Sequence, residues 1–143
     1  MRARTRLPRT VLALGLTSLL TDASSEMIFP LLPLYLTQVL GAGPAFLGAV
    51  EGAADTVASV LKYLSGRWAD RARRRKPLVA FGYGLAGAVR PLVALAQAPW
   101  HVLAVRLADR VGKGLRSAPR DALIADAAGE GQAGRAFGFH RAM

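Results

Sequence analysis

Two pairs of carboxylates and three arginines stand where charged side chains are costly, inside segments that are otherwise apolar. Asp22 and Glu26 lie in the first long apolar stretch, and Glu51 and Asp55 lie in the second. Each pair is spaced four residues apart, so its two carboxylates share one face if the stretch is helical. Three bases fall at comparable depths in later segments, namely Arg90, Arg106 and Arg110. The sequence therefore sets four acids against three arginines.

Two interpretations of these charges are open. A lone charge in the middle of a membrane costs at least about 2.5 to 3.5 kcal/mol, so such residues pair or face water. In the structural interpretation they form a neutral network that locks a helix bundle, and Asp109 could pair within its own helix with Arg106 and Lys113. In the functional interpretation at least one carboxylate binds and releases protons or contacts a cationic substrate, because desolvation disfavours its charged form. We favour function, since intramembrane ionisable residues usually mark pathways.

In this functional hypothesis the seven charges line a pathway for substrate and protons. Asp22 and Glu26 handle protons or a cationic substrate, while Glu51 and Asp55 assist them or pair. Arg110 tunes the protonation of a carboxylate or meets an anionic group. The whole pathway comprises Asp22, Glu26, Glu51, Asp55, Arg90, Arg106 and Arg110.

The segments that carry these charges are long enough to cross a membrane. About 20 mostly apolar residues span the roughly 30 Å hydrocarbon core of a bilayer, and the first three stretches reach that length. The sequence predicts an all-α, polytopic transmembrane helix bundle, with residues 1–143 as one partial N-terminal domain. Four spanning helices and the start of a fifth are expected, the four at about 10–36, 45–64, 77–98 and 100–127.

Prolines predict irregularities in two of these helices. Pro30 and Pro33 lie in the outer third of the first helix, and Pro91 follows Arg90 in the third. Each proline removes an intrahelical hydrogen bond and bends the axis.

The fourth helix is the most polar of the four. Five polar residues repeat at intervals of three and four and so share a face: Arg106, Arg110, Lys113, Ser117 and Arg120. An apolar stripe is expected opposite, formed by Leu103, Leu107, Val111, Leu115, Ala118 and Ala122. A spanning helix carries such a polar face only towards water or partner charges. The alternative is a short apolar segment followed by an amphipathic helix lying on the membrane.

Basic residues crowd alternate connections and indicate the orientation. Twelve cations flank the N-terminus, the second connection and the end of the fourth helix: Arg2, Arg4, Arg6, Arg9, Arg67, Arg71, Arg73, Arg74, Arg75, Lys76, Arg135 and Arg141. The other two connections, near residues 37–45 and 97–101, carry none. Basic loops stay in the cytoplasm, so we expect a multi-pass protein of the cell membrane with a cytoplasmic N-terminus. A cleaved signal peptide is the rival interpretation of the first segment, but apolar character resumes at Met27, so a continuous span is simpler.

Composition by itself favours a different class of protein. A net charge of +10 and a pI near 11.4 are typical of nucleic-acid binding, but the apolar runs argue against it. Cysteine is absent, so there is no disulfide, thiol nucleophile or thiolate metal site. We expect a lipid bilayer and a small solute as partners, with no cofactor, metal or nucleic acid.

The second connection and the fourth helix carry motifs. Residues 66–76, GRWADRARRRK, resemble the G-x-x-x-D-R-x-G-R-R signature that the major facilitator superfamily carries between transmembrane helices 2 and 3. Arg110 to Gly114 are similar to that superfamily's R-x-x-x-G element on helix 4. Residues 21–30 and 109–125 look like a branch of prokaryotic permeases within it. Order, loop length and sidedness agree, so the resemblance covers essentially the whole chain.

This resemblance implies a transporter and no enzymatic activity. Members have about twelve helices in two halves around a midplane site, and one half rocks against the other. Transport of a small solute, coupled to protons, is therefore expected. Residues 134–143 look like the lead-in to a fifth helix, so we expect a fragment that lacks the C-terminal half.

The signature also suggests a conformational switch. It would comprise Gly66, Asp70, Arg71 and Arg74. In the family, the aspartate that matches Asp70 helps to hold the outward-facing state by contacts between the halves. Arg73 stands where the signature has glycine, and a left-handed backbone there would cost about 1 kcal/mol. A helix cap or surface ion pair is the alternative for Asp70, and contact with anionic lipid is the alternative for the arginines.

An integral-membrane transferase acting on lipid headgroups is a competing function, as is a purely structural bundle. A transferase would need carboxylates that hold a divalent cation, and Asp121, Asp126 and Glu130 are poorly spaced for that. Residues 112–114 lack the remaining features of a phosphate-binding loop. His101 and His140 are interpreted as interfacial polar residues.

Overall fold

The computed structural model describes residues 7–71, 74–129 and 131–143, and the regular structure in these ranges is helical throughout. Five charges discussed above lie outside the described residues: Arg2, Arg4, Arg6, Arg73 and Glu130. The elements in chain order are α1 (Arg9–Ile28), η1 (Phe29–Leu31), α2 (Leu32–Leu34), η2 (Tyr35–Val39), α3 (Pro44–Arg71), α4 (Lys76–Val89), η3 (Arg90–Leu95), α5 (Pro99–Ala128) and α6 (Ala133–Ala142). The predicted all-α fold is confirmed.

Prolines set the irregular parts of two helices. The first helix changes to 3₁₀ geometry at η1, which contains Pro30, and regains α geometry at α2 before ending in the wider π turn of η2. In the same way, α4 passes into the 3₁₀ segment η3 at Arg90 and Pro91. Proline cannot donate the hydrogen bond that would continue an α-helix. Both predicted irregularities therefore occur where the prolines stand.

The predicted end of the second helix was wrong. α3 continues to Arg71, seven residues past the expected end at residue 64. Its extra turns pack on α5, because Ser65 and Ala69 are buried and the Ser65 hydroxyl donates a 2.8 Å hydrogen bond to the Gly114 carbonyl. Packing thus keeps the segment helical although its sequence is polar. The fourth helix, by contrast, agrees with prediction to within one residue at each end.

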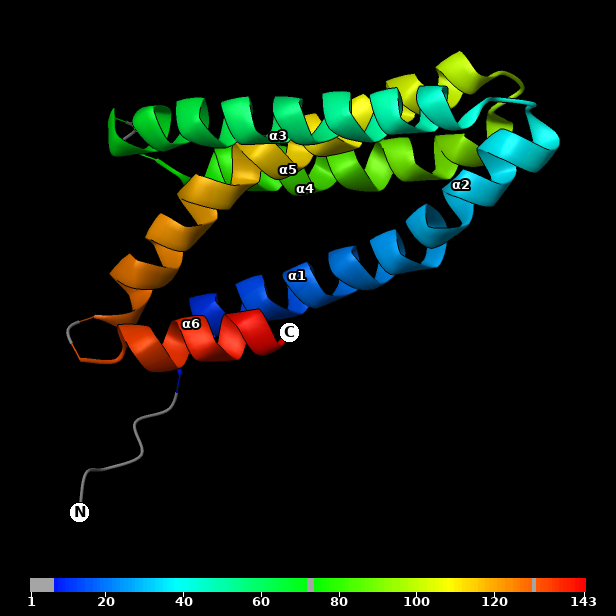
Figure 1. Cartoon of the computed structure of the whole chain (residues 1–143). Helices are drawn as coiled ribbons and strands as arrows, with labels where there is room; N and C mark the ends of the chain where they lie inside the picture. Colours follow the sequence, from blue (N-terminus) through cyan, green and yellow to red (C-terminus); the bar gives the residue numbers. More distant parts are fainter. Residues whose placement is uncertain (1–6, 72–73, 130) are drawn as a thin grey trace.

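Figure 1 shows α3, α4 and α5 side by side, with α1 inclined to them and α6 lying along the beginning of α1. α5 has extensive contacts with both α3 and α4. The connections near residues 40–43 and 96–98 lie at one end of the bundle, and those near 74–75 and 131–132 lie towards the other. We call these the outer and inner ends, after the predicted orientation.

Two separate apolar clusters close the two ends. The outer cluster contains Leu32, Leu36, Ala96 and Val102, and beside it the Tyr35 hydroxyl donates a 2.6 Å hydrogen bond to the Ala96 carbonyl. The inner cluster joins α1, α5 and α6 through Val11, Ile124, Ala128 and Ala136. Between them lies the level of the charged residues.

Glycines let the central helix approach its neighbours closely. A Cβ on Gly82 of α4 would stand 2.6 Å from the Gly112 carbonyl oxygen of α5. A Cβ on Gly114 would stand 2.6 Å from the Leu61 Cβ of α3. Small residues at such crossings are typical of helix packing in membranes. The glycine of the R-x-x-x-G element is therefore required by contact between helices.

Two helices of the described chain are long and apolar enough to cross a membrane, Arg9–Val39 and Lys76–Leu95. Many of their large side chains face outwards, including Leu16, Leu20, Met27 and Phe81. The helices α3 and α5, of 28 and 30 residues, are the more highly charged ones described below, and the number of spans remains a prediction.

The Gly82 crossing leads to a stability prediction. Ala at position 82 should lower the free energy of unfolding by about 1 to 3 kcal/mol, because its Cβ meets backbone and the Arg116 Cβ at 2.7 Å and overpacking forces neighbours apart. Gly84 on the same helix is exposed with open space around it, so G84A should be neutral or stabilising, as alanine favours helix. Unfolding by SDS titration in bicelles would measure both variants. Equal stability of G82A and G84A would contradict the close packing.

Candidate functional site

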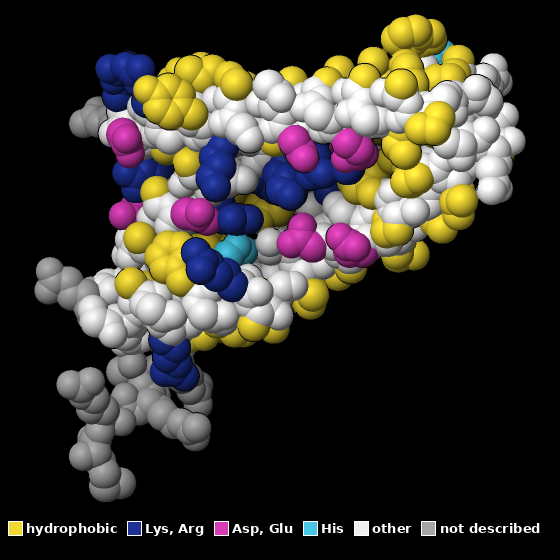
Figure 2. All heavy atoms as spheres, in the orientation of Figure 1, with side chains coloured by type: hydrophobic (Ala, Val, Ile, Leu, Met, Phe, Trp, Pro, Cys, Tyr) yellow, Lys and Arg dark blue, Asp and Glu magenta, His cyan; other side chains and the backbone are white. Residues whose placement is uncertain are grey.

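A pocket of about 420 Å³ opens at the middle level of the bundle, between α1 and α5. Figure 2 shows acidic and basic side chains gathered in the hollow between α3 above and α1 below, with hydrophobic side chains on the outer surfaces. The pocket is lined by Asp22, Ser25, Glu26, Phe29, Arg90, Arg106, Asp109, Arg110, Lys113 and Arg116. Five of the seven charges predicted to line a pathway are therefore brought together here.

The faces predicted for α5 were only partly right. Charged and apolar residues are buried on the same side of the helix, because Arg106, Asp109 and Arg116 are buried together with Val102 and Val105. The residues expected to form the apolar stripe, such as Leu103 and Leu107, are half-buried. α5 is contacted by α1, α3 and α4, so it has no single apolar side.

Arg106 forms the best-defined ion pair with α3. Its Nε and Nη2 atoms donate hydrogen bonds of 3.0 and 2.7 Å to the two carboxylate oxygens of Glu51. The guanidinium also lies 3.9 Å from the centre of the Phe29 ring, a favourable cation–π geometry. A bidentate pair fixes the orientation of the guanidinium and neutralises its charge. Arg106 of α5 therefore contacts both α3, through Glu51, and η1, through Phe29.

Arg110 and Asp55 form a looser pair one turn further along. Their Nε and Oδ1 atoms are 3.7 Å apart, and the Asp55 side chain is 73 % exposed. Because α3 and α5 run in the same direction (Figure 1), the four-residue spacing of Glu51 and Asp55 matches that of Arg106 and Arg110. Glu51 and Asp55, which were predicted to assist or pair, are therefore both paired with arginines of α5. The Glu51 pair is close, and the Asp55 pair is longer and more exposed.

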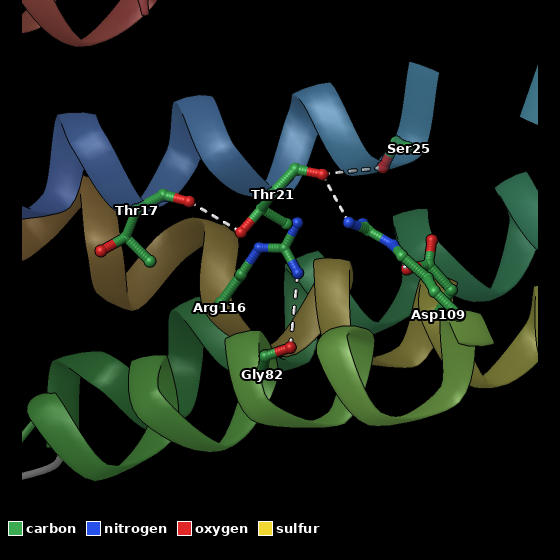
Figure 3. A network of polar contacts seen from close by, with 7 residues as sticks. Thr17, Thr21, Ser25, Gly82, Asp109 and Arg116 are labelled. Carbon is green, nitrogen blue, oxygen red and sulfur yellow. Dashed lines mark hydrogen bonds and ion pairs between the residues drawn. The ribbon is translucent and has the colours of Figure 1, made fainter. Parts of the chain in front are cut away.

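Arg90 and Asp109 form a fully buried pair between η3 and α5. Their side chains are 3 and 2 % exposed, and Nε donates a 2.9 Å hydrogen bond to Oδ1. Arg90 also donates from Nη1 to the Thr21 carbonyl of α1, which accepts a second hydrogen bond of 3.2 Å from the Ser25 hydroxyl (Figure 3). Asp109 thus pairs across helices instead of with Arg106 or Lys113 of its own helix.

The acids of α1 stand apart from this network. Asp22 and Glu26 are exposed to the pocket, and neither has a basic nitrogen within 4.0 Å among the described residues. Asp22 accepts only a long 3.4 Å hydrogen bond from the Ser18 hydroxyl. The α1 wall therefore presents negative charge to the pocket without a direct ion pair in the part of the chain that the structure describes.

The opposite wall presents positive charge. Arg116 is 3 % exposed, lies 4.5 Å from the Tyr83 ring centre and donates a 3.3 Å hydrogen bond to the Gly82 carbonyl (Figure 3). Neither Arg116 nor Lys113 forms an ion pair with another residue that the structure describes. The Nη1 atom of Arg106 is also buried, and it has no hydrogen-bond partner among the residues that the structure describes.

Comparison with known proteins decides the family. A family model described as Major Facilitator Superfamily matches residues 14–143. The chain belongs to the major facilitator superfamily. As its members act in membranes, this is a membrane protein, and its identification from the two motifs is confirmed.

Relatives of this major facilitator chain extend well beyond its length. An uncharacterised MFS-type transporter of Methanocaldococcus jannaschii is 38 % identical over 96 % of this chain and 34 % of the relative. An uncharacterised protein of Mycobacterium tuberculosis is 35 % identical over 94 % of this chain and 33 % of its own length. The chain thus spans about a third of these relatives. No solved structure matches it significantly.

The major facilitator signature lies on the last turns of α3 and in the connection that follows. Gly66 faces Ala118 of α5, and a Cβ on it would be 3.7 Å away, an ordinary contact. The remaining residues predicted for the switch are exposed: Asp70, Arg71 and Arg74. They do not line the charged pocket, and their role in a conformational switch stays a prediction.

Sequence reasoning missed two features of this superfamily member. Arg75 joins the ends of α3 and α5, because its Nε donates a 3.0 Å hydrogen bond to the Ala69 carbonyl and its Nη1 pairs with Asp126. The partners are 51 residues apart, so nothing in the local pattern connects them. Arg116 was also overlooked as a pocket residue, although its spacing of three from Lys113 and ten from Arg106 would have placed it near that face.

No metal site is formed by the part of the chain that the structure describes, since no group of three or more His, Asp or Glu residues comes together in it. Of the acids considered for a metal-dependent transferase, Asp121 pairs with Arg120 and Asp126 with Arg75.

The ion pairs of this site should differ sharply in their contribution to stability. D109N should lower the free energy of unfolding by about 3 to 5 kcal/mol, because Arg90 is then left charged and buried without a counter-ion. D55N should change it by less than about 1 kcal/mol, because an exposed pair contributes little. SDS titration of both variants measures the difference. Equal free energies of unfolding for D109N and D55N would show that the buried pair does not stabilise the fold more than the exposed one.

Proposed function

We propose that the whole protein to which this chain contributes is a secondary transporter that moves a small solute across the cell membrane and couples this movement to protons. The supporting observation is the charged pocket, where the unpaired carboxylates of α1 face the cations of α5 within an apolar bundle. Ionisable groups kept at this cost in a membrane usually serve transport.

The charged residues around the pocket fall into two groups, those held in close ion pairs and those without one. Arg90 and Arg106 are held by buried or bidentate pairs, which suits fixed joints between helices. Asp22 and Glu26 have no such partner, so their protonation can change without breaking a joint. We assign them the proton or a cationic substrate group. Arg110, loosely paired, is the base positioned to respond when a carboxylate is neutralised.

Four spans with a cytoplasmic N-terminus follow from this proposal. α3 and α5 cross the membrane beside α1 and α4, and their charges face the pocket instead of lipid. The remaining two thirds of the relatives' length supply the opposite wall, against which this bundle rocks in alternating access. The exposed signature residues Asp70, Arg71 and Arg74 contact that wall at the inner end.

The assignment of Asp22 is tested by proton movement. In proteoliposomes containing the whole protein, solutes from a panel are added and pH changes are followed with a fluorescent dye. D22N should abolish solute-dependent proton flux, because an amide cannot release a proton, whereas D22E should retain part of it. Full proton flux in D22N would remove Asp22 from the pathway.

The topology is tested by labelling single cysteines, which the cysteine-free chain permits. Gly43 and Gln97 are exposed at the outer end, and Arg74 and Gly134 are exposed towards the inner end. Impermeant maleimide should label positions 43 and 97 in intact cells, and positions 74 and 134 only after permeabilisation. Labelling of position 134 from outside would mean that α5 does not cross.

A further inference from the structure

Three cations form a row on the α5 wall of the charged pocket. Arg110, Lys113 and Arg116 follow one another at intervals of three residues, and all three line the pocket. Side chains three residues apart are neighbours on a helix, and like charges at this spacing destabilise it. A helix that only had to pack would be more stable with a neutral side chain in this row.

The row lacks close negative partners within the described chain. Lys113 and Arg116 form no ion pair there. The Nε atom of Arg110 is buried without a hydrogen-bond partner, and the nearest carboxylate of α3 is 3.7 Å from it. Asp109, the acid that α5 itself adds to the pocket, is bound by Arg90. The row therefore has donors to spare for an anion that enters the pocket.

Arg116 is the most deeply buried member of the row. Only 3 % of its surface is exposed, and its guanidinium lies 4.5 Å from the centre of the Tyr83 ring. Its Nη1 atom donates a hydrogen bond to the Gly82 carbonyl (Figure 3), which uses one of the five N–H groups of a guanidinium. Because a buried charge without a counter-ion is costly, Arg116 is held by its neighbours in a state that a negative ligand would stabilise.

Lys113 complements Arg116 at the open side of the site. Its side chain is exposed and lines the same pocket. An ammonium is a compact charge on a flexible stem, whereas a guanidinium offers a planar fork that matches a carboxylate or a phosphate. The pocket volume of about 420 Å³ is within the range of small-molecule sites. One wall thus combines a fixed donor group, a flexible one and room for a solute.

We propose that Lys113 and Arg116 bind an oxyanion of the transported solute, either a carboxylate or a phosphate group. This proposal rests on the transport function proposed above and names its substrate class, a small solute that carries negative charge. Arg110, loosely paired, completes the positive side of the site.

An anion bound at this wall faces the acids of α1. Asp22 and Glu26 line the same pocket as Lys113 and Arg116. Like charges repel each other, so these acids weaken the binding of an anion while they are ionised. Replacing Asp22 with asparagine should therefore tighten the binding.

The chain offers a matched control for Lys113. Lys62 on α3 is also an exposed lysine, but it is not among the residues that line the pocket. K62Q therefore removes the same charge from outside the site. Because Lys113 is exposed, K113Q keeps the test independent of Arg116, whose replacement could unfold the protein.

The test is thermal unfolding of the whole protein in an uncharged detergent at constant ionic strength. The probes are benzoate, phenyl phosphate, the uncharged benzamide and the cation benzylammonium. A ligand that binds the folded state raises the unfolding temperature with its concentration, which gives a dissociation constant for each probe. Benzoate or phenyl phosphate should stabilise the protein, whereas benzamide and benzylammonium should not.

The variants locate the bound anion. K113Q should weaken its binding about tenfold or more, because a charged hydrogen-bond donor is lost, and K62Q should leave it unchanged. D22N should tighten it about two- to fivefold, because a like charge is removed. Equal effects of K113Q and K62Q, weaker binding in D22N, or equal stabilisation by benzamide and benzoate would each overturn the proposal.

Two further measurements separate a solute from other occupants. Short-chain phosphatidylglycerol that displaces the probes where glycerol phosphate does not would assign the site to a lipid headgroup and overturn the solute. Uptake of carboxylates and phosphate esters into proteoliposomes separates this proposal from the transport function. Binding that depends on Lys113 without uptake of any solute would refute the transporter and leave the anion site, whereas uptake that K113Q does not change would refute the anion site alone.

Discussion

The desolvation of the charges on α5 is the constraint on which the rest of the bundle depends. An arginine or aspartate taken out of water needs a partner charge, hydrogen bonds or an aromatic face, and each buried charge of α5 finds these on a different neighbour. Glu51 on α3 neutralises Arg106, Arg90 at the end of α4 neutralises Asp109, and the aromatic ring of Tyr83 covers Arg116. Charge compensation thus fixes the position of α5 against its neighbours, and the glycine contacts set how close they come.

Most of the charged residues could be placed from the sequence, but their partners could not. The spacing of four between Asp22 and Glu26, and between Glu51 and Asp55, predicts shared faces because helix geometry is local. Pairing depends on the direction and offset of helices far apart in sequence, so the pair of Arg90 with Asp109 was not foreseen. The end of α3 was misjudged for a similar reason, since packing of Ser65 and Ala69 on α5 outweighs a polar sequence. His140 was interpreted as an interfacial residue but is only 6 % exposed, because α1 and α5 pack on its helix and this packing leaves no mark on the local sequence.

The two apolar clusters attach the first helix to the bundle on either side of the polar level. At the outer end, packing and the hydrogen bond from Tyr35 to the Ala96 carbonyl join the first helix to the connection before α5. At the inner end, α6 and α5 hold the start of α1. α1 is therefore attached at both ends, and near its carboxylates the Arg90 side chain donates a hydrogen bond to the Thr21 carbonyl and so connects the middle of the helix to the network.

The order of the ion-pair partners along the chain bears on biogenesis. Glu51 and Asp55 precede Arg106 and Arg110 by 55 residues, and Arg90 precedes Asp109 by 19. When the ribosome has completed α5, every counter-charge for these residues has already been synthesised. In the proposed topology α5 is too polar to partition into lipid by itself, but it can leave the translocon together with the earlier helices, which already carry the counter-charges of Arg106, Asp109 and Arg110. If α5 spans the membrane as proposed, the positions of its partners along the chain therefore bear on its insertion as well as on its place in the finished bundle.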